Sequence, residues 1–345
     1  MSGPLRLLLL GSLPPPMGGT TLLLRQLLDQ LARRGDVRVR HLETGPGRAG
    51  RLGAGLRVAG GLARQLSWAQ VVSVHASPPG LAALLPALVP LCRLARRRLV
   101  ARVFGGSLDV EIAQAEPALR ARLERILDCD RVLVETRQLL ESLARSYPAA
   151  SLGQLANHRP LPDRPPRLPT GPARRFVFLG HVTRAKGVLD LVEAVEGLAD
   201  PPFEVAVYGP EPQEPLVRDR LRRSQRVHYG GLLPHERVAE VLAGVDALVL
   251  PTTHAGEGHP GAVLEAFVAG RPVVATRWRA LPELVEDGAS GLLVPPGDAQ
   301  ALAAAMSELA RSGERLHALA RGAWRQAQHF DAPRWTERFL HFCTG

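Results

Sequence analysis

The stretch PTTHAGEGHPGAVLEAFVAGRPVVAT, residues 251–276, predicts the fold around it. An apolar run that ends at Leu250 indicates a buried strand, and a polar loop follows it. Pro260 stands where a helix would begin, a position that suits proline because the missing amide hydrogen is not needed there. Gly270 ends that helix, and RPVVAT is the next apolar run. A strand, a helix and a second strand in this order form the crossover unit of a parallel sheet.

The same alternation of short apolar runs and helical patterns extends along the chain and predicts parallel sheets covered by helices. The first half has predicted strands at residues 5–10, 37–42, 71–75, 99–103 and 131–134. The second half has them at residues 176–179, 203–208, 227–229, 247–250, 272–275 and 291–294. Between the two halves, residues 158–175 hold six prolines and predict a linker. We therefore expect two doubly wound α/β domains, with a ligand site in the crevice between them.

Composition limits the class of protein. The chain has 345 residues, 46% of them apolar, which suits two domains that each bury a core. Its net charge of +10 admits three kinds of partner: nucleic acid, an anionic membrane surface or a phosphorylated ligand. Aromatic residues make up only 4% and no compact basic and aromatic block occurs, so nucleic acid is not expected.

The cysteines and the apolar segments bear on the compartment. Cys92, Cys129 and Cys343 are widely spaced, which predicts neither disulfides nor a metal site and favours a reduced, cytosolic setting. The run LRLLLLGSL (5–13) resembles a secretory signal, but it is short and leads into PPPMGG, so a first buried strand is the better interpretation. No segment reaches about twenty uninterrupted apolar residues, so no transmembrane helix is expected.

One position stands out by composition. The stretch GHVTRAKGVLD (180–190) contains Lys186, the only lysine among the 43 lysine and arginine residues. A strongly G+C-biased genome explains why lysine is scarce, and asparagine also occurs only once, at Asn157. Both residues are therefore candidates for positions at which substitution has been resisted.

The predicted helix start at Pro260 is a candidate anion site. Unpaired amides and the positive end of the helix dipole attract phosphate there. Glu257 lies in the loop before the helix and Glu265 lies on it, eight positions later. Two such carboxylates can accept hydrogen bonds from a sugar and a ribose at opposite ends of a diphosphate. The alternative is a solvated loop glutamate and an ordinary surface glutamate.

The second half of the chain resembles the retaining glycosyltransferases of family 4 (glycosyl transferases group 1). These carry Glu-x7-Glu followed by EAxxxGxPVVAT, which EAFVAGRPVVAT (265–276) matches, and LPELVEDGASGLLVPPGD (281–298) also fits. The resemblance implies the GT-B fold of two Rossmann-like domains with a cleft between them. It implies an N-terminal acceptor-side domain (1–160), a linker (161–174), a C-terminal nucleotide-sugar-binding domain (175–329) and a terminal helix (330–345) that packs back on the first domain.

The resemblance also implies site residues. Glu257 would hold hydroxyls of the donor sugar and Glu265 the ribose. The donor-binding loop between them includes Gly258, His259, Pro260 and Gly261. No metal site is expected.

The family neutralises the leaving diphosphate with an arginine and a lysine in a GRxxxxKG turn. Here the turn is GHVTRAKG, so Lys186 matches, while His181 stands where arginine is usual. Either Arg184 supplies the missing charge from a shifted position or His181 donates to the phosphate itself. Lys186 and Glu257 are the predicted catalytic residues.

In the first half, Gly18 and Gly19 match a glycine pair that the family places near the diphosphate and acceptor, although a simple tight turn explains them equally well. Phe104 stands where many members have a histidine that contacts the donor sugar, so no catalytic histidine is assigned. We interpret His75 as a satisfied histidine at a strand end. Asn157 matches the end of a family PN pair and is expected to satisfy backbone groups at the hinge.

The arginine-rich stretches 92–99 and 48–64 leave two readings open. Either they mark a membrane-facing patch on the acceptor domain, or their arginines result from the G+C bias of the genome and lie on solvated faces. Gly55, Gly60 and Gly61 weaken the second stretch as a helix.

These expectations together describe a metal-independent, cofactor-free retaining glycosyltransferase. It would move a sugar from a nucleoside diphosphate sugar to a sugar, a lipid-linked or a small-molecule acceptor, in bacterial glycan, glycolipid or glycosylated metabolite synthesis. It would act in the cytoplasm, with peripheral contact at the inner face of the cell membrane as an open alternative. A second hypothesis is that the protein is a catalytically silent nucleotide-sugar-binding or partner subunit. A third hypothesis is an epimerase on the same fold, but the intact Glu-x7-Glu segment disfavours it.

Overall fold

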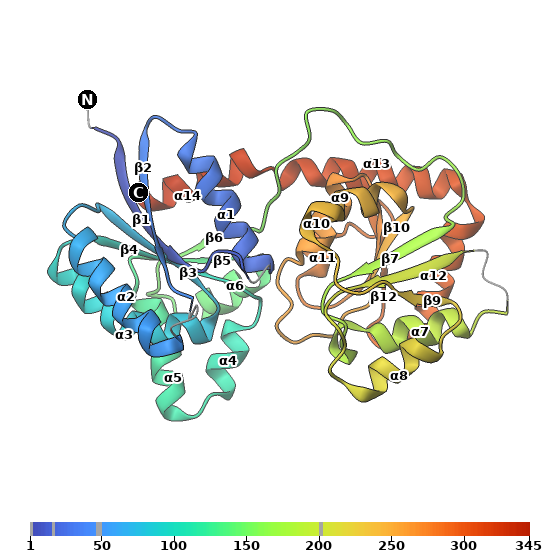
Figure 1. Cartoon of the computed structure of the whole chain (residues 1–345), viewed down its shortest axis with the longest axis horizontal. Helices are drawn as coiled ribbons and strands as arrows, with labels where there is room; N and C mark the ends of the chain where they lie inside the picture. Colours follow the sequence, from blue (N-terminus) through green and yellow to red (C-terminus); the bar gives the residue numbers. More distant parts are fainter. Residues whose placement is uncertain (1–2, 16–17, 46–49, 200–202) are drawn as a thin grey trace. The chain divides into compact units, whose positions relative to one another are not determined.

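The computed structural model describes residues 3–15, 18–45, 50–199 and 203–345. The chain forms two compact units (Figure 1). The first unit contains Met1–His158 and Ala332–Gly345, and the second contains Arg159–Asp331. Each has one six-stranded sheet whose strand pairs are all parallel. The prediction of two doubly wound α/β domains is confirmed.

The first sheet has the strand order β2-β1-β3-β4-β5-β6. Its strands are β1 (Leu5–Gly11), β2 (Val37–Glu43), β3 (Val71–Ala76), β4 (Arg98–Val103), β5 (Arg131–Val134) and β6 (Leu152–Gln154). Its helices are α1 (Gly19–Ala32), α2 (Gly50–Gln65), α3 (Pro78–Leu94), α4 (Leu108–Gln114), α5 (Pro117–Glu124), η1 (Arg125–Asp128), α6 (Arg137–Ser146) and α14 (Ala332–Thr344). Four successive leucines of β1, from Leu7 to Leu10, are fully buried, as expected of a strand covered on both faces.

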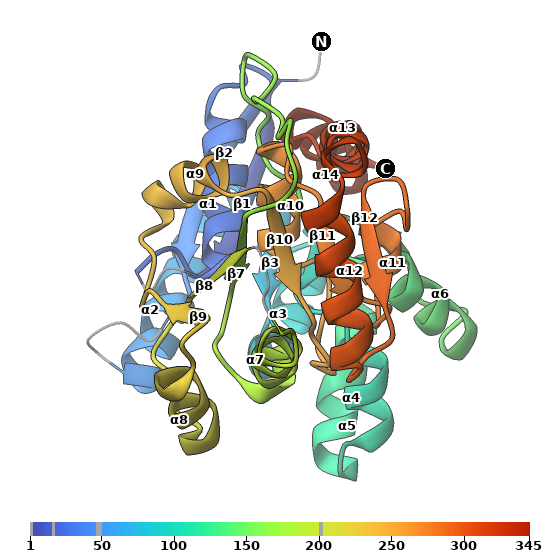
Figure 2. The ribbon, with the colours of Figure 1, turned by 90° about the vertical axis from the view of Figure 1, so that its right-hand side faces the viewer.

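The second sheet has the order β12-β11-β10-β7-β8-β9. Its strands are β7 (Arg175–Leu179), β8 (Glu204–Tyr208), β9 (Val227–Tyr229), β10 (Ala247–Leu250), β11 (Val273–Thr276) and β12 (Gly291–Val294). The helices are η2 (Arg184–Lys186), α7 (Val188–Glu196), α8 (Pro215–Arg223), α9 (His235–Gly244), α10 (Gly261–Val268), α11 (Leu281–Leu284), α12 (Ala299–Arg311) and α13 (Gly313–His329). Helix α7 packs with α8 and α12, and α10 packs with α9 and α13 (Figure 2).

All predicted strands are present, and their ends agree with the observed strands to within one residue. Strand β6 was not predicted, because it has only three residues and no buried run that distinguishes it. Helix α2 forms although Gly55, Gly60 and Gly61, which were expected to weaken it, lie within it. At Gly61 a Cβ atom would lie 2.4 Å from a methyl group of Leu42, so close packing on β2 explains that glycine.

Two further segments complete the units. Between β6 and β7 the described chain has no helix or strand, apart from one isolated bridge between Arg159 and Asp331. Helix α14 packs in the first unit, where Trp335, Phe339 and Leu340 are buried. In the part of the chain that the structure describes, no helix is both long and apolar enough to cross a membrane.

Candidate functional site

Lys186 lies on a turn that the sequence fixes tightly. It ends the 3-10 helix η2, which follows β7, and its amide donates to the side chain of Thr183 at 3.3 Å. The next residue, Gly187, has a left-handed φ of 78°, and a Cβ atom there would lie 1.9 Å from the carbonyl oxygen of Pro251. Only glycine fits this position, so the lysine turn is held directly against the loop that follows β10.

Glu257 is the partner of Lys186. The Nζ atom of Lys186 donates to both carboxylate oxygens of Glu257, at 2.8 and 2.7 Å. Thr252 donates its hydroxyl to Glu257 Oε2 at 2.6 Å, and the Glu257 side chain is only 5% exposed. The lysine side chain is 18% exposed. An ammonium group has three N–H donors, so the two bonds to Glu257 leave a third for a ligand.

Backbone and hydroxyl contacts lock the surrounding loops. The amide of Thr253 donates to the carbonyl of Ala185 at 2.8 Å, which ties the loop after β10 to η2. The Thr276 hydroxyl, at the end of β11, donates to the Thr252 carbonyl at 2.5 Å. Strands β7, β10 and β11 are neighbours in the sheet, so the pair lies where their carboxyl ends meet. This edge is the usual ligand-binding edge of a parallel sheet.

Glu265, the second glutamate of the predicted motif, pairs with a residue that the sequence analysis did not select. Arg159 donates its Nε to Glu265 Oε1 at 3.0 Å, and its Nη2 lies 2.9 Å from the same oxygen. The side chains are 6% and 18% exposed. The Arg159 amide donates to the Phe330 carbonyl at 3.0 Å, which anchors the arginine. Arg159 lies in the proline-rich segment, 106 residues before Glu265, and no spacing pattern links the two.

Helix α10 begins one residue later than predicted. Pro260 is its N-cap and Gly261 its first residue, because Pro260 has an extended ψ of 126°. A Cβ atom on Gly261 would lie 2.3 Å from Arg159 Nη2, so the guanidinium crosses the first turn of α10. The predicted anion-binding helix start therefore has a cation beside it.

The remaining loop residues take different positions. Gly258 is buried, and so is the ring of His259, whose Nε2 lies 3.5 Å from Glu283 Oε2 and whose face meets Phe330 edge-on. His181 and Arg184 are exposed, and the Arg184 amide donates to Glu214 Oε1 at 3.0 Å. The roles assigned to these residues stay predictions.

His254, in the same loop, was not selected from the sequence. Its pKa is lowered, first by burial and then by the positive charge of Lys186, while Glu257 raises it and His181 lowers it further. The charges of Lys186, Glu257 and His181 therefore all act on His254. The HAGEGH segment contains His254 two residues after Thr252, but no spacing rule marks it as a site residue.

Gly18 and Gly19 lie in the first unit, as the N-cap and the first residue of α1. A Cβ atom on Gly18 would meet only the Thr21 hydroxyl, at 3.9 Å, and one on Gly19 would meet nothing within 4 Å. Gly11 differs, because a Cβ there would lie 2.5 Å from a Leu24 methyl group. Packing of the described chain therefore explains Gly11 and does not explain the Gly18–Gly19 pair.

Other predicted positions of the first unit are interior. His75 is 2% exposed, lies 2.9 Å from the Ser73 hydroxyl and has a strongly lowered pKa because it is buried. Phe104 is 4% exposed and stacks under the guanidinium of Arg102, itself fully buried. Arg102 donates to Asn157 Oδ1 at 3.3 Å, so this bond of Asn157 goes to a side chain, where a backbone partner was predicted.

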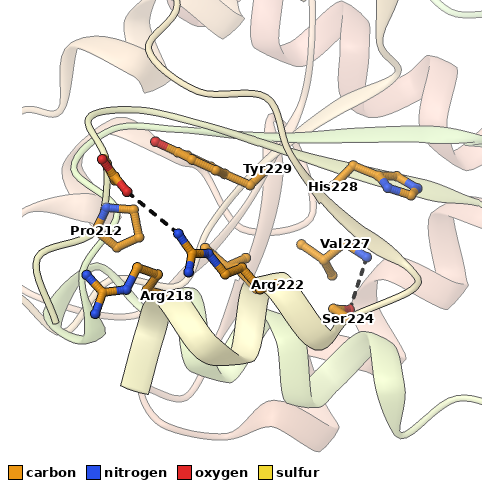
Figure 3. A pocket seen from close by; sticks show the side chains of 9 residues that line it. Pro212, Arg218, Arg222, Ser224, Val227, His228 and Tyr229 are labelled. Atoms are coloured by element: carbon orange, nitrogen blue, oxygen red, sulfur yellow. Dashed lines mark hydrogen bonds and ion pairs between the residues drawn. The ribbon is translucent and has the colours of Figure 1, made fainter. Parts of the chain in front are cut away.

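A groove of about 330 Å³ lies between α8 and β9 on the second unit, and Figure 3 shows the side chains that line it. Arg218 and Arg222 of α8 line it together with His228 and Tyr229 of β9, and Arg222 lies 4.0 Å from Glu211. None of the predicted donor-binding residues lines this groove. Among the described residues, no three His, Cys, Asp or Glu side chains are grouped as metal ligands would be.

A lysine, two carboxylates and the start of helix α10 lie at the carboxyl edge of the second sheet, an arrangement that suits a phosphorylated ligand. Comparison with known proteins points to a family. Residues 173–312 match the model of the glycosyl transferases group 1 family. Membership of family 4 within the group stays a prediction.

Curated relatives match only part of the chain. The 2-deoxystreptamine N-acetyl-D-glucosaminyltransferase of Streptomyces fradiae is 33% identical over 200 residues, which are 55% of this chain and 45% of that protein. The chain thus spans less than half the length of this relative.

Solved structures match the whole chain at low identity. Sucrose-phosphate synthase of Thermosynechococcus elongatus is 19% identical, with a TM-score of 0.77, over 97% of this chain and 98% of that one. HepE of Anabaena, solved in complex with UDP, is 16% identical, with a TM-score of 0.76, over 98% and 99%. These likenesses confirm the expected GT-B fold.

Proposed function

We propose that the protein is a retaining, metal-independent glycosyltransferase that moves a sugar from a nucleoside diphosphate sugar to an acceptor hydroxyl. The biological setting we propose is bacterial glycan, glycolipid or glycosylated metabolite synthesis in the cytoplasm. The family match of residues 173–312 supports the class of reaction. The observation that carries the proposal is the Lys186–Glu257 pair, which joins the only lysine of the chain to the first glutamate of the family motif.

The negative charge that develops during the proposed reaction explains why a cation, Lys186, lies at this site. When the bond between the sugar carbon and the phosphate oxygen breaks, negative charge grows on the departing diphosphate. The third N–H of Lys186 and the open amides at the start of α10 are donors for that charge. Donors that are fixed before the reaction stabilise the transition state more than the ground state, and the Gly187 turn fixes Lys186 in this way.

Glu257 has a second task in this proposal. A carboxylate has about four acceptor positions, and the bonds from Lys186 and Thr252 occupy three of them. The fourth is available for a hydroxyl of the donor sugar. Glu265 is similar, because both Arg159 bonds go to Oε1 and neither uses Oε2, which is available for a ribose hydroxyl.

The donor class rests on this arrangement and on the HepE structure, which was solved with UDP. Metal independence rests on the cations that the chain itself provides at the site. Transfer activity is therefore expected to be unchanged in excess EDTA. Activity that EDTA abolishes and Mg²⁺ or Mn²⁺ restores would contradict this part of the proposal.

The test is release of nucleoside diphosphate from a panel of nucleotide sugars by the purified protein. We expect one or a few donors to be hydrolysed slowly without acceptor and rapidly with it, and NMR of the product to show a retained anomeric configuration. A silent binding subunit is the second candidate, because an exposed histidine, His181, replaces the usual arginine. That candidate is supported if the protein binds a nucleoside diphosphate, releases none from any donor, and Glu257→Ala behaves identically.

A further inference from the structure

A cavity of about 380 Å³ lies at the edge of the second sheet opposite to the Lys186–Glu257 pair. Of its lining residues, Arg175 is the first residue of β7, Asp246 directly precedes β10, and Arg271 lies two residues before β11. These strands are neighbours in the sheet, so the cavity lies where their amino ends meet, and we call it the amino-end cavity. None of the residues proposed to bind the donor lines it.

Arginine dominates the charge of the amino-end cavity. Arg167, Arg174, Arg175 and Arg271 line it, and Asp246 is the one acidic residue among the described residues that do so. Asp246 is already engaged, because its Oδ2 accepts bonds from the amides of Arg174 and Arg175 at 2.8 and 2.9 Å. The side chains of Arg167 and Arg175 are exposed and donate to no described residue. The cavity therefore has more positive charge than its own residues neutralise.

Arg271 distinguishes this cavity from a patch of solvated arginines. It is only 5% exposed, and its guanidinium donates to the carbonyls of Leu242, Ala243 and Arg167 at 2.8 to 2.9 Å. A guanidinium has five N–H groups, so these three bonds leave two. The G+C bias of the genome explains arginine on exposed faces, but a buried cation is costly unless it is bonded in this way. Arg271 is therefore a fixed donor group at the cavity.

The proline-rich segment that forms one wall of the cavity is held on the second unit. The carbonyl oxygen of Pro169, a lining residue, lies 2.9 Å from His317 Nδ1. The amide of Ala173 donates to the Leu309 carbonyl at 2.9 Å. The cavity is therefore preformed, and a ligand need not order this segment in order to bind.

We propose that the amino-end cavity binds a small compound with two or more phosphate groups, at a site separate from the proposed donor site. Guanidinium groups from three segments, at Arg167, Arg175 and Arg271, suit the several oxygens of a tetrahedral phosphate, whereas a planar carboxylate offers only two. One phosphate group carries a charge of about −2, which four arginines exceed, so a ligand with at least two phosphates is expected. The volume is that of a small-molecule site.

Calorimetric titration of the full chain with inorganic pyrophosphate tests the site. The titration uses the Lys186→Gln variant, because this exchange disables the proposed diphosphate contact of the donor site and leaves the cavity unchanged. We expect one pyrophosphate to bind, with an affinity that falls as salt is added. The further exchange Arg175→Gln is expected to raise the Kd at least about tenfold, as for loss of a hydrogen bond between charged groups.

Arg222→Gln in the same background is the matched control. Arg222 is also an exposed arginine of the second unit, but it lies on α8 and does not line the amino-end cavity. This exchange is expected to leave the Kd unchanged. The proposal is overturned if the Lys186→Gln variant binds no pyrophosphate, or if the Arg175 and Arg222 exchanges weaken binding equally. Tighter binding of citrate than of pyrophosphate would assign the cavity to carboxylates and also overturn it.

Hydrogen exchange shows where pyrophosphate binds. The amides of Arg174 and Arg175 are expected to exchange more slowly when it is bound, since both donate to Asp246 in the cavity. Slower exchange only in residues 251–261 would place pyrophosphate at the donor site and overturn the proposal. Neither measurement needs sugar transfer, so failure of this proposal and failure of the proposed function are distinguishable.

Discussion

The two glutamates of the Glu-x7-Glu motif are both paired with a cation from elsewhere in the sequence, but the pairs differ in geometry. Lys186 spreads its bonds over both oxygens of Glu257, which is 5% exposed. Arg159 directs its Nε and its Nη2 to one oxygen of Glu265, which is 18% exposed. A compact ammonium keeps one donor for a ligand, whereas the planar fork of arginine bonds to one carboxylate oxygen and does not use the other.

This difference separates two functions. Under the proposed function, Lys186 of the first pair binds the diphosphate and the glutamate holds the lysine in place. Glu265 of the second pair binds the ribose, and Arg159 acts as a positioning residue. Substitutions in the first pair should therefore lower turnover, and substitutions in the second should mainly weaken donor binding.

The largest effect is expected for Glu257→Gln. This change keeps the size of the side chain but removes the charge that holds Lys186 and weakens acceptance of a sugar hydroxyl. The turnover number is expected to fall about a thousandfold or more, as for loss of an interaction made in the transition state. Initial rates of nucleoside diphosphate release measure it, and a thermal unfolding curve controls for loss of fold. A rate within about threefold of the wild type would remove Glu257 from the catalytic centre.

Lys186→Arg should have the next largest effect. Arginine keeps the charge but cannot give two bonds to Glu257 and a third to a phosphate from one atom. We expect turnover to fall about a hundredfold, with weaker binding of nucleoside diphosphate and little change for nucleoside. Arg237→Lys is the matched control, because Arg237 is an exposed surface residue of α9. Equal effects of the two exchanges would show that the lone lysine has no special role.

Arg159→Lys and Glu265→Gln test the second pair. Each is expected to raise the KM for the donor about tenfold while turnover changes little, because the ribose contact is made equally in the ground and transition states. The double variant should cost about as much as either single one, since the two residues act as one unit. A loss of turnover without a change in KM would move this pair into the catalytic group.

The smallest effect is expected on the titration of His254. Burial, and then the charge of Lys186, holds its pKa below the ordinary 6.5. Protonation therefore opposes folding: any stabilisation is present above pH 6.5 and is lost as the pH falls toward the lowered pKa. Lys186→Gln should raise this pKa and Glu257→Gln should lower it, as followed by NMR of the imidazole protons. Glu265→Gln should leave it unchanged, and a shift there would show that the two pairs are electrically coupled.

Much of the fold follows from local sequence, because buried parallel strands appear as short apolar runs between turn signals. Strand β6 could not be predicted from local sequence, because it depends on pairing with β5 and on packing against Phe342. At the site, Glu257, Glu265 and Lys186 were recognised from the motifs. Arg159 was not, because a pairing across 106 residues depends on the folded path of the chain. The bond between Arg102 and Asn157 was missed for the same reason, as a buried arginine on a strand leaves no sequence pattern.

The most direct test of the central claim is a double-mutant cycle on Lys186 and Glu257. The value of kcat/KM for sugar transfer is measured for the wild type, Lys186→Gln, Glu257→Gln and the double variant. The proposed pair predicts a large loss for each single change and little further loss for the double change, because either substitution breaks the same unit. Independent, multiplying losses would contradict the claim, and so would full activity in any of the three variants.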